Sequence, residues 1–171
     1  AITALKECQG RIMSMAMIHE NLYRSNILTG IEFKEYVDHI IKNIFHTHNI
    51  SFDKFKVNII AQDIILNIDT AIPTGLIINE LVTNSIKHAF PGRETGEITI
   101  QLEQEQDEYY LKVADNGIGI SSNLDVNHTS TLGLLLVNSL VSQLDGNLQV
   151  ATDGGTAFHI NFKKLEYLDR I

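Results

Sequence analysis

The spacing of apolar residues along the chain predicts helices first and mainly strands afterwards. From Leu5 to Leu22, apolar residues recur at alternating spacings of three and four, which is typical of a helix that packs in a bundle or a dimer. Residues 26–30 interrupt this pattern. Thr29 and Glu32 then have the spacing of a capping box, and apolar residues on one face of the segment 33–45 predict a second helix.

Beyond residue 49 the pattern changes, and apolar and polar residues alternate roughly every second position in several segments. Segments 55–60 and 64–68 are predicted strands, and Pro73 is predicted to stand in the first turn of a helix that runs to about Phe90. Two hairpins are predicted, one from segments 97–103 and 109–114 and one from segments 147–151 and 156–162. Between them, residues 132–144 predict an apolar helix that Gly146 ends. This order predicts an α+β fold, a two-layer α/β sandwich with an N-terminal helical extension.

The helix that ends near Phe90 carries a candidate site. On an α-helix, four of its polar residues fall within about 100° of one another: Glu80, Asn84, Lys87 and His88. The Asn84 amide oxygen suits Mg²⁺, and Glu80 could hold metal-bound water or accept a proton. Lys87 and His88 could offset phosphate charge. The alternative is the exposed polar face of an ordinary helix.

A glycine-containing turn follows the first predicted hairpin. Asp115 stands at its mouth, and a carboxylate there can accept a hydrogen bond from an exocyclic amine. Gly117 and Gly119 would let the backbone approach a flat ring. The alternative for residues 115–117 is a simple turn without a ligand.

Three further residues are weaker candidates. Gly133 opens the apolar helix, where free backbone N–H groups favour an anion. Thr156 follows a Gly-Gly hairpin turn, and no neighbouring motif residue supports a role for it in a site. His19 lies on the N-terminal helical pattern, where a structural histidine is favoured over a phosphoacceptor.

Composition and charge narrow the class of protein. The chain has 171 residues and a net charge of −8 with no basic run, which argues against binding to nucleic acid or to an anionic membrane. An acidic protein that binds a nucleotide is expected to use a divalent cation. A single cysteine, Cys8, suits a reducing compartment, and no apolar run approaches the about 20 residues of a membrane span. We therefore expect a cytoplasmic location, and we interpret the chain as a piece of a larger protein.

Taken together, these motifs resemble those of the sensor histidine kinases, within the ATPase superfamily that includes gyrase B and MutL. Residues 79–90 resemble the N box, residues 115–119 the G1 box, residues 131–134 a reduced G2 box, and residues 154–158 the closing strand motif. Residues 11–23 resemble the second dimerisation helix of the HisKA_2 subgroup. The resemblance implies a Bergerat-type (GHKL) fold with two regions, 1–28 as a partial dimerisation region and 29–171 as the ATP-binding catalytic domain.

The resemblance also implies residue roles. Asn84 would coordinate Mg²⁺, Glu80 would be the base or a metal-water ligand, and Asp115 would bind the adenine amine. Residues 121–130 would form the ATP lid. The remaining implied contacts with ATP come from Lys87, His88, Gly117, Gly119, Gly133 and Thr156.

The implied function is transfer of the ATP γ-phosphoryl group to a histidine, followed by relay to an aspartate on a response-regulator receiver domain. The acceptor would lie on a first dimerisation helix that is missing from this chain, because His19 matches the second helix. A homodimer through the dimerisation helices is expected. Two alternatives are a serine kinase of the anti-sigma-factor type and a degenerate module that acts as a dimerising scaffold.

Overall fold

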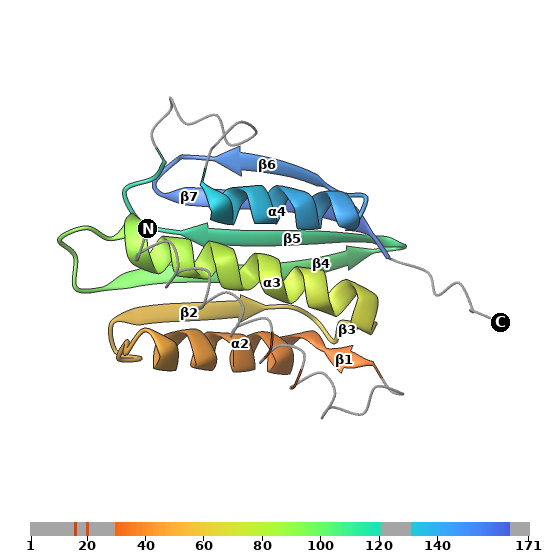
Figure 1. Ribbon diagram of the computed structural model, residues 1–171, viewed down its shortest axis with the longest axis horizontal. Helices are drawn as coiled ribbons and strands as arrows, with labels where there is room; N and C mark the ends of the chain where they lie inside the picture. Colours follow the sequence, from red (N-terminus) through yellow and green to blue (C-terminus); the bar gives the residue numbers. More distant parts are fainter. Residues whose placement is uncertain (1–15, 17–19, 21–29, 121–130, 165–171) are drawn as a thin grey trace.

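The computed structural model describes residues 16, 20, 30–120 and 131–164. Of the helical pattern at residues 5–22, the description includes only residues 16 and 20. His19, Thr29 and the expected lid at residues 121–130 lie outside the described residues. In the described part, helices α2, α3 and α4 lie side by side over one face of a five-stranded sheet (Figure 1). This arrangement confirms the predicted α+β two-layer fold.

The sheet has the strand order β2-β4-β5-β7-β6. Its strands are β2 (Phe55–Ile60), β4 (Gly96–Glu105), β5 (Glu108–Asp115), β6 (Asn147–Ala151) and β7 (Thr156–Lys163). Strands β2 and β4 are parallel, and every other pair in this sheet is antiparallel. Both predicted hairpins are confirmed. Buried and exposed residues alternate along β7, so one face of the sheet is left for the helices to cover.

Helix α2 (Phe33–Thr47) confirms the second predicted helix, but its cap differs from the predicted capping box. The Glu32 carboxylate accepts hydrogen bonds from the backbone N–H groups of Lys34 and Glu35, at 3.1 and 2.6 Å. Glu32 is therefore the N-cap itself, and an acidic group there also suits the helix dipole. Glu32 and the residue before it also form the short strand β1 (Ile31–Glu32), which pairs with β3 (Ile65–Leu66).

Helix α3 (Ile68–Asn84) begins earlier than predicted. Asn67 is its N-cap, because the Asn67 side chain accepts a hydrogen bond from the Thr70 N–H at 2.9 Å. Pro73 consequently lies in the second turn rather than the first. The predicted strand at residues 64–68 shortens to the two residues of β3, since the Asn67 cap starts a helix within the apolar run.

The last part of this helical segment is a π-helical turn over Ser85–Ala89. A helix up to about Phe90 was expected, and the extent is confirmed. The regular α-helical winding that was expected for these residues is wrong, because a π-helical turn contains more residues than an α-helical one. Angular positions calculated for a regular α-helix therefore do not apply to Lys87 and His88.

Helix α4 (Leu132–Gln143) confirms the predicted apolar helix and packs against α3 and β6. The helix stops shortly before Gly146, in agreement with the prediction. The left-handed residue of the turn is Asp145, with φ +50°. Gly146 instead permits a close approach, since a Cβ atom on it would lie 2.7 Å from the Asn161 carbonyl oxygen.

The core lies between the sheet and the three helices. Among its fully buried residues are Phe33, Phe45, Ile77, Ile78, Leu81, Ile98, Ile100 and Leu111. Among the described residues, no helix combines the length and the apolar character that crossing a membrane requires. The core thus fixes α3 directly over the sheet, with its polar C-terminal end beside the end of β5.

Candidate nucleotide site

The carboxylate of Asp115 is the point at which the site is assembled. Asp115 is the last residue of β5 and is half-buried. One oxygen, Oδ2, accepts a hydrogen bond from the Ser85 hydroxyl at 2.8 Å. The other, Oδ1, accepts from the backbone N–H groups of Gly117 at 3.0 Å and Thr156 at 3.2 Å. One side chain therefore joins the end of α3, the glycine turn and the start of β7.

The glycine turn packs against the π-helical turn without room for side chains. A Cβ atom on Gly117 would overlap the Ala89 carbonyl oxygen, and the N–H of Ile118 donates to that same oxygen at 2.9 Å. Gly119 has φ +76°, and a Cβ atom on it would lie 3.1 Å from the Gly155 carbonyl oxygen. Gly117 and Gly119 thus allow three backbone segments to meet beside Asp115.

Asn116 holds the other side of this turn. Its Oδ1 accepts a hydrogen bond from the Glu97 N–H at 2.9 Å, and its own N–H donates to the Glu97 carbonyl oxygen at 3.1 Å. Arg93 donates from Nη1 to the Asn116 carbonyl oxygen at 3.0 Å. The turn is fixed to the first residues of β4 by these bonds, so the position of Asp115 does not depend on β5 alone.

The polar residues of α3 and the π-helical turn differ in exposure. Glu80 is buried, at 5% exposure, and Asn84 is half-buried one turn later. Lys87 and His88 are exposed. The four side chains thus run from the interior to the surface along one helical segment. Ser85, the residue after Asn84, is the one that donates a hydrogen bond from this segment to Asp115, at 2.8 Å.

Lys87 also influences a residue of α2. Burial lowers the pKa of His48, and the positive charge of Lys87 lowers it further. His48 is the residue that follows α2. The Lys87 ammonium group therefore lies near the C-terminal end of α2 in this structure.

The two remaining candidates, Thr156 and Gly133, differ in their relation to Asp115. Thr156 is buried, at 4% exposure, and contributes its backbone N–H to Asp115. Gly133 is buried in the first turn of α4, which begins after Thr131. The segment before it lies outside the described residues, and no described contact joins Gly133 to Asp115.

The donor set on α3 fits a magnesium ion that is shared with phosphates. Mg²⁺ prefers oxygen ligands, and it usually takes one or two from protein and the rest from phosphates and water. Asn84 offers one half-buried amide oxygen, and Glu80 offers a carboxylate one turn away. Within the described ranges, no three His, Cys, Asp or Glu side chains gather to hold a metal by themselves. The residues present therefore suit a cation that arrives with a nucleotide.

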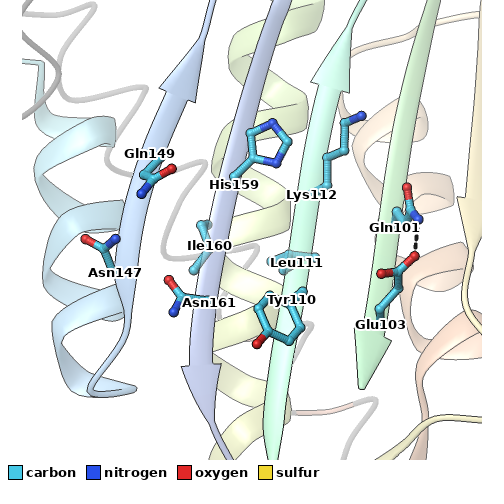
Figure 2. A pocket seen from close by; sticks show the side chains of 10 residues that line it. All are labelled: Gln101, Glu103, Tyr110, Leu111, Lys112, Asn147, Gln149, His159, Ile160 and Asn161. Carbon is cyan, nitrogen blue, oxygen red and sulfur yellow. Dashed lines mark hydrogen bonds between the residues drawn. The ribbon is translucent and has the colours of Figure 1, made fainter. Parts of the chain in front are cut away.

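A separate shallow hollow lies on the uncovered face of the sheet, away from the helices. Figure 2 shows polar side chains from four neighbouring strands around it, with a hydrogen bond from Gln101 to Glu103 at 2.6 Å. Lys112 and His159 stand on adjacent strands there and are register partners. None of the residues predicted for the nucleotide site lines this hollow.

Sequence reasoning missed three residues of the site: Ser85, Ala89 and Gly155. A position beside Asn84 in the N box is the only sequence signal for Ser85. Gly155 was interpreted as part of a hairpin turn, whereas a Cβ atom on it would overlap the Asp115 carbonyl oxygen. Gly154, which has open space around it, fits the turn interpretation.

Comparison with known families agrees with this geometry. The model of the histidine kinase-, DNA gyrase B-, and HSP90-like ATPase family (HATPase_c) matches residues 70–166, more than half of the chain. The chain therefore belongs to this ATPase family. A second model, the histidine kinase family HisKA_2, matches residues 1–48. The combination is that of a sensor histidine kinase of two-component signalling, and the family implies ATP binding.

Two curated relatives and one solved structure show how far the similarity extends along the chain. The sensor histidine kinase PdtaS of Mycobacterium tuberculosis is 32% identical over 150 residues, which cover 85% of this chain and 29% of PdtaS. The serine-protein kinase RsbW of Listeria innocua is 29% identical over 105 residues, covering 53% of this chain and 67% of RsbW. The histidine kinase domain from the Erythrobacter litoralis EL346 blue-light activated histidine kinase superposes with a TM-score of 0.77 at 25% identity, covering 90% of this chain and 75% of that domain. The chain spans less than a third of the length of PdtaS.

Proposed function

We propose that residues 29–171 form a catalytic domain that binds ATP with Mg²⁺ and transfers its γ-phosphoryl group to a histidine. The observation that carries the proposal is the convergence of three separate segments on the Asp115 carboxylate. These segments coincide with three motifs whose order resembles that of histidine kinases. The family match over residues 70–166 supports the same assignment.

Asp115 has the capacity to recognise the adenine amine. An ionised carboxylate offers about four lone-pair sites. Three hydrogen bonds, from Ser85, Gly117 and Thr156, already reach Asp115. Counting the described residues alone, about one acceptor site is left for an exocyclic N–H. Gly117 and Gly119 would shape the pocket for a flat base by letting the backbone segments beside Asp115 pack closely.

The polar end of the helical segment would hold the charged part of the nucleotide. We assign Asn84 to the magnesium ion, and Glu80 to a metal-bound water or to the proton of the incoming nucleophile. Bound Mg²⁺ would offset charge on the phosphate oxygens. Lys87, His88 and the N-terminal turn of α4 at Gly133 would lie toward the phosphates, and Thr156 would border the base.

The phosphoacceptor in this proposal is a histidine on a dimerisation helix outside residues 1–171. Residues 1–28 would supply the second helix of that region, and His19 would have a structural role there. Two copies of the chain would pair through these helices. An aspartate on a response-regulator receiver domain would receive the phosphoryl group next. The HisKA_2 match over residues 1–48 supports a dimerisation segment here.

The serine-kinase alternative rests on the likeness to RsbW, which covers 53% of this chain. The match of residues 1–48 to a histidine kinase family favours histidine as the acceptor. The scaffold alternative requires a site that no longer binds nucleotide. The three hydrogen bonds on Asp115 argue against such decay.

Phosphotransfer with γ-labelled ATP tests the proposal. Residues 1–171 alone should remain unlabelled, and a longer form that contains the proposed acceptor helix should gain acid-labile, base-stable phosphate. Asp115→Asn should abolish labelling of the longer form, whereas Asp153→Asn, which changes an exposed carboxylate, should not. Stoichiometric label on His19, or acid-stable label on a serine, would contradict the proposal.

A further inference from the structure

The Ser85 hydroxyl is a buried polar group whose described hydrogen bond is to the Asp115 carboxylate. Ser85 is 6% exposed, and its Oγ lies 2.8 Å from Oδ2. Because Oδ1 takes the two backbone N–H groups of Gly117 and Thr156, Ser85 holds the oxygen that the backbone leaves free. Both carboxylate oxygens are therefore fixed, and rotation of the carboxylate would break a bond at either end.

Ser85 is the first residue of the π-helical turn, and its own N–H still donates to the Leu81 carbonyl oxygen, as in an α-helix. Ser85 therefore lies about 140° around the helix from Glu80, outside the polar stripe and on the side where its hydroxyl reaches Asp115. The turn is attached to the glycine loop at its far end as well, where the Ile118 N–H donates to the Ala89 carbonyl oxygen at 2.9 Å. The unusual winding thus connects the N box to the G1 turn at both of its ends.

We propose that Ser85 is a positioning residue that sets the selectivity of the site for a purine that bears an exocyclic amine. This inference rests on the proposed function. With Ser85 donating, the Asp115 carboxylate is held in one orientation and presents its remaining lone pair in one direction. An amine in that direction donates to it. A purine with a carbonyl oxygen at the same position would place its own lone pairs against those of the Asp115 carboxylate. Two acceptors cannot form a hydrogen bond, so the site should strongly disfavour such a purine.

Loss of the hydroxyl therefore affects one ligand more than the other. In Ser85→Ala the carboxylate loses a charge-assisted hydrogen bond and its fixed orientation. Binding of ATP should weaken on the order of tenfold, which is a typical effect of such a bond. Binding of inosine triphosphate, which has the same phosphates and a carbonyl oxygen in place of the amine, should change by less than about twofold because it makes no use of that orientation.

Calorimetry with Mg²⁺ and each of the two nucleotides tests this on the full chain. The unmodified chain should prefer ATP, the preference of Ser85→Ala should be about tenfold smaller, and that of Ser85→Cys, with a weaker donor, should be intermediate. The matched control is Thr74→Val. Thr74 is a buried hydroxyl on α3 whose Oγ1 donates to the Thr70 carbonyl oxygen at 2.7 Å. Its removal should lower the unfolding temperature and leave the preference unchanged.

The outcomes separate the inference from the proposed function. An unchanged preference in Ser85→Ala, or an equal loss of affinity for both nucleotides, would show that Ser85 has only a structural role. If Ser85→Ala does not fold, Ser85→Cys alone decides, and a preference equal to that of the unmodified chain overturns the inference. Failure of the folded, unmodified chain to bind either nucleotide overturns the proposed function itself, and the inference with it.

Discussion

The backbone of Gly155 packs directly against that of Asp115. A Cβ atom on Gly155 would overlap the Asp115 carbonyl oxygen, whereas one on Gly154 would meet nothing within 4 Å. This approach lets the next residue, Thr156, donate its N–H to the Asp115 carboxylate. The second hairpin is therefore a wall of the site as well as part of the sheet.

Gly155→Ala should consequently destabilise the fold more than Gly154→Ala. Gly155 has φ +142° and no room, so we expect the substitution to cost about 2 kcal/mol or more of unfolding free energy. Gly154 has φ +68° and open space, so only backbone strain of about 1 kcal/mol is expected. Urea unfolding of the two variants measures the difference, and equal losses would show that the close packing at Gly155 contributes nothing.

A second prediction concerns Tyr36 and high pH. Its hydroxyl donates to the Ala71 carbonyl oxygen at 3.0 Å between α2 and α3, and burial raises the pKa of Tyr36 well above its usual value. In the unfolded chain tyrosine ionises at about pH 10. Above that pH the unfolded state loses a proton that the folded state keeps, so the free energy of unfolding should fall by about 1.4 kcal/mol per pH unit from this group.

Tyr36→Phe removes that dependence. The variant should be less stable than the unmodified chain below pH 10, by about 1 kcal/mol for the lost hydrogen bond. The gap should narrow as the pH rises above 10, because only the unmodified chain carries the Tyr36 contribution. Chemical denaturation between pH 8 and about pH 11 measures both curves. Parallel curves over that range would contradict the assignment of a buried, protonated Tyr36.

A third prediction concerns the charge of Lys87. Because its positive charge contributes to the lowered pKa of His48, Lys87→Gln should raise that pKa, with burial keeping part of the shift. An NMR titration of the His48 ring measures it. Lys42→Gln is the control, since Lys42 lies on α2 and pairs with Asp38. A His48 pKa that responds to Lys42 but not to Lys87 would place the Lys87 ammonium group elsewhere.

The same pair has a consequence for stability at acidic pH. A lowered folded-state pKa means that the unfolded chain binds a proton to His48 before the folded chain does. The contribution of His48 is therefore present above the usual histidine pKa and is lost as the pH falls through the folded-state value. Lys87→Gln should reduce this loss.

Much of the fold was predictable because the hydrophobic pattern determined it. The alternation in β7 and the apolar face of α2 each agree with the structure, as does the α+β class. The start of α3 was not predicted correctly, because Asn67 caps a helix inside an apolar run that also resembles a strand. Pro73 is tolerated in the second turn, although its sequence signal is that of a first turn.

The site was predictable as a set of motifs but not as a set of contacts. Asp115, Gly117 and Thr156 were all named from the sequence, and the structure joins them directly. Ser85 could not be named, since a period of 3.6 residues turns it away from the polar stripe, and nothing in the sequence shows that this other side of the helix meets Asp115. Nor does the sequence show that Gly155 needs its missing side chain for contact with Asp115 rather than for the hairpin turn.

The central claim is that this chain holds ATP through Asp115 and a magnesium ion at Asn84. Calorimetry with ATP in the presence and absence of Mg²⁺ tests it most directly, on the unmodified chain and on Asp115→Asn and Asn84→Ala. Asp153→Asn and Asn147→Ala, which alter exposed residues of the same types, are the controls. We predict Mg²⁺-dependent binding that Asp115→Asn abolishes, that loses its Mg²⁺ dependence in Asn84→Ala, and that both controls retain. Absence of binding by the folded, unmodified chain, or unchanged binding in Asp115→Asn, would contradict this account.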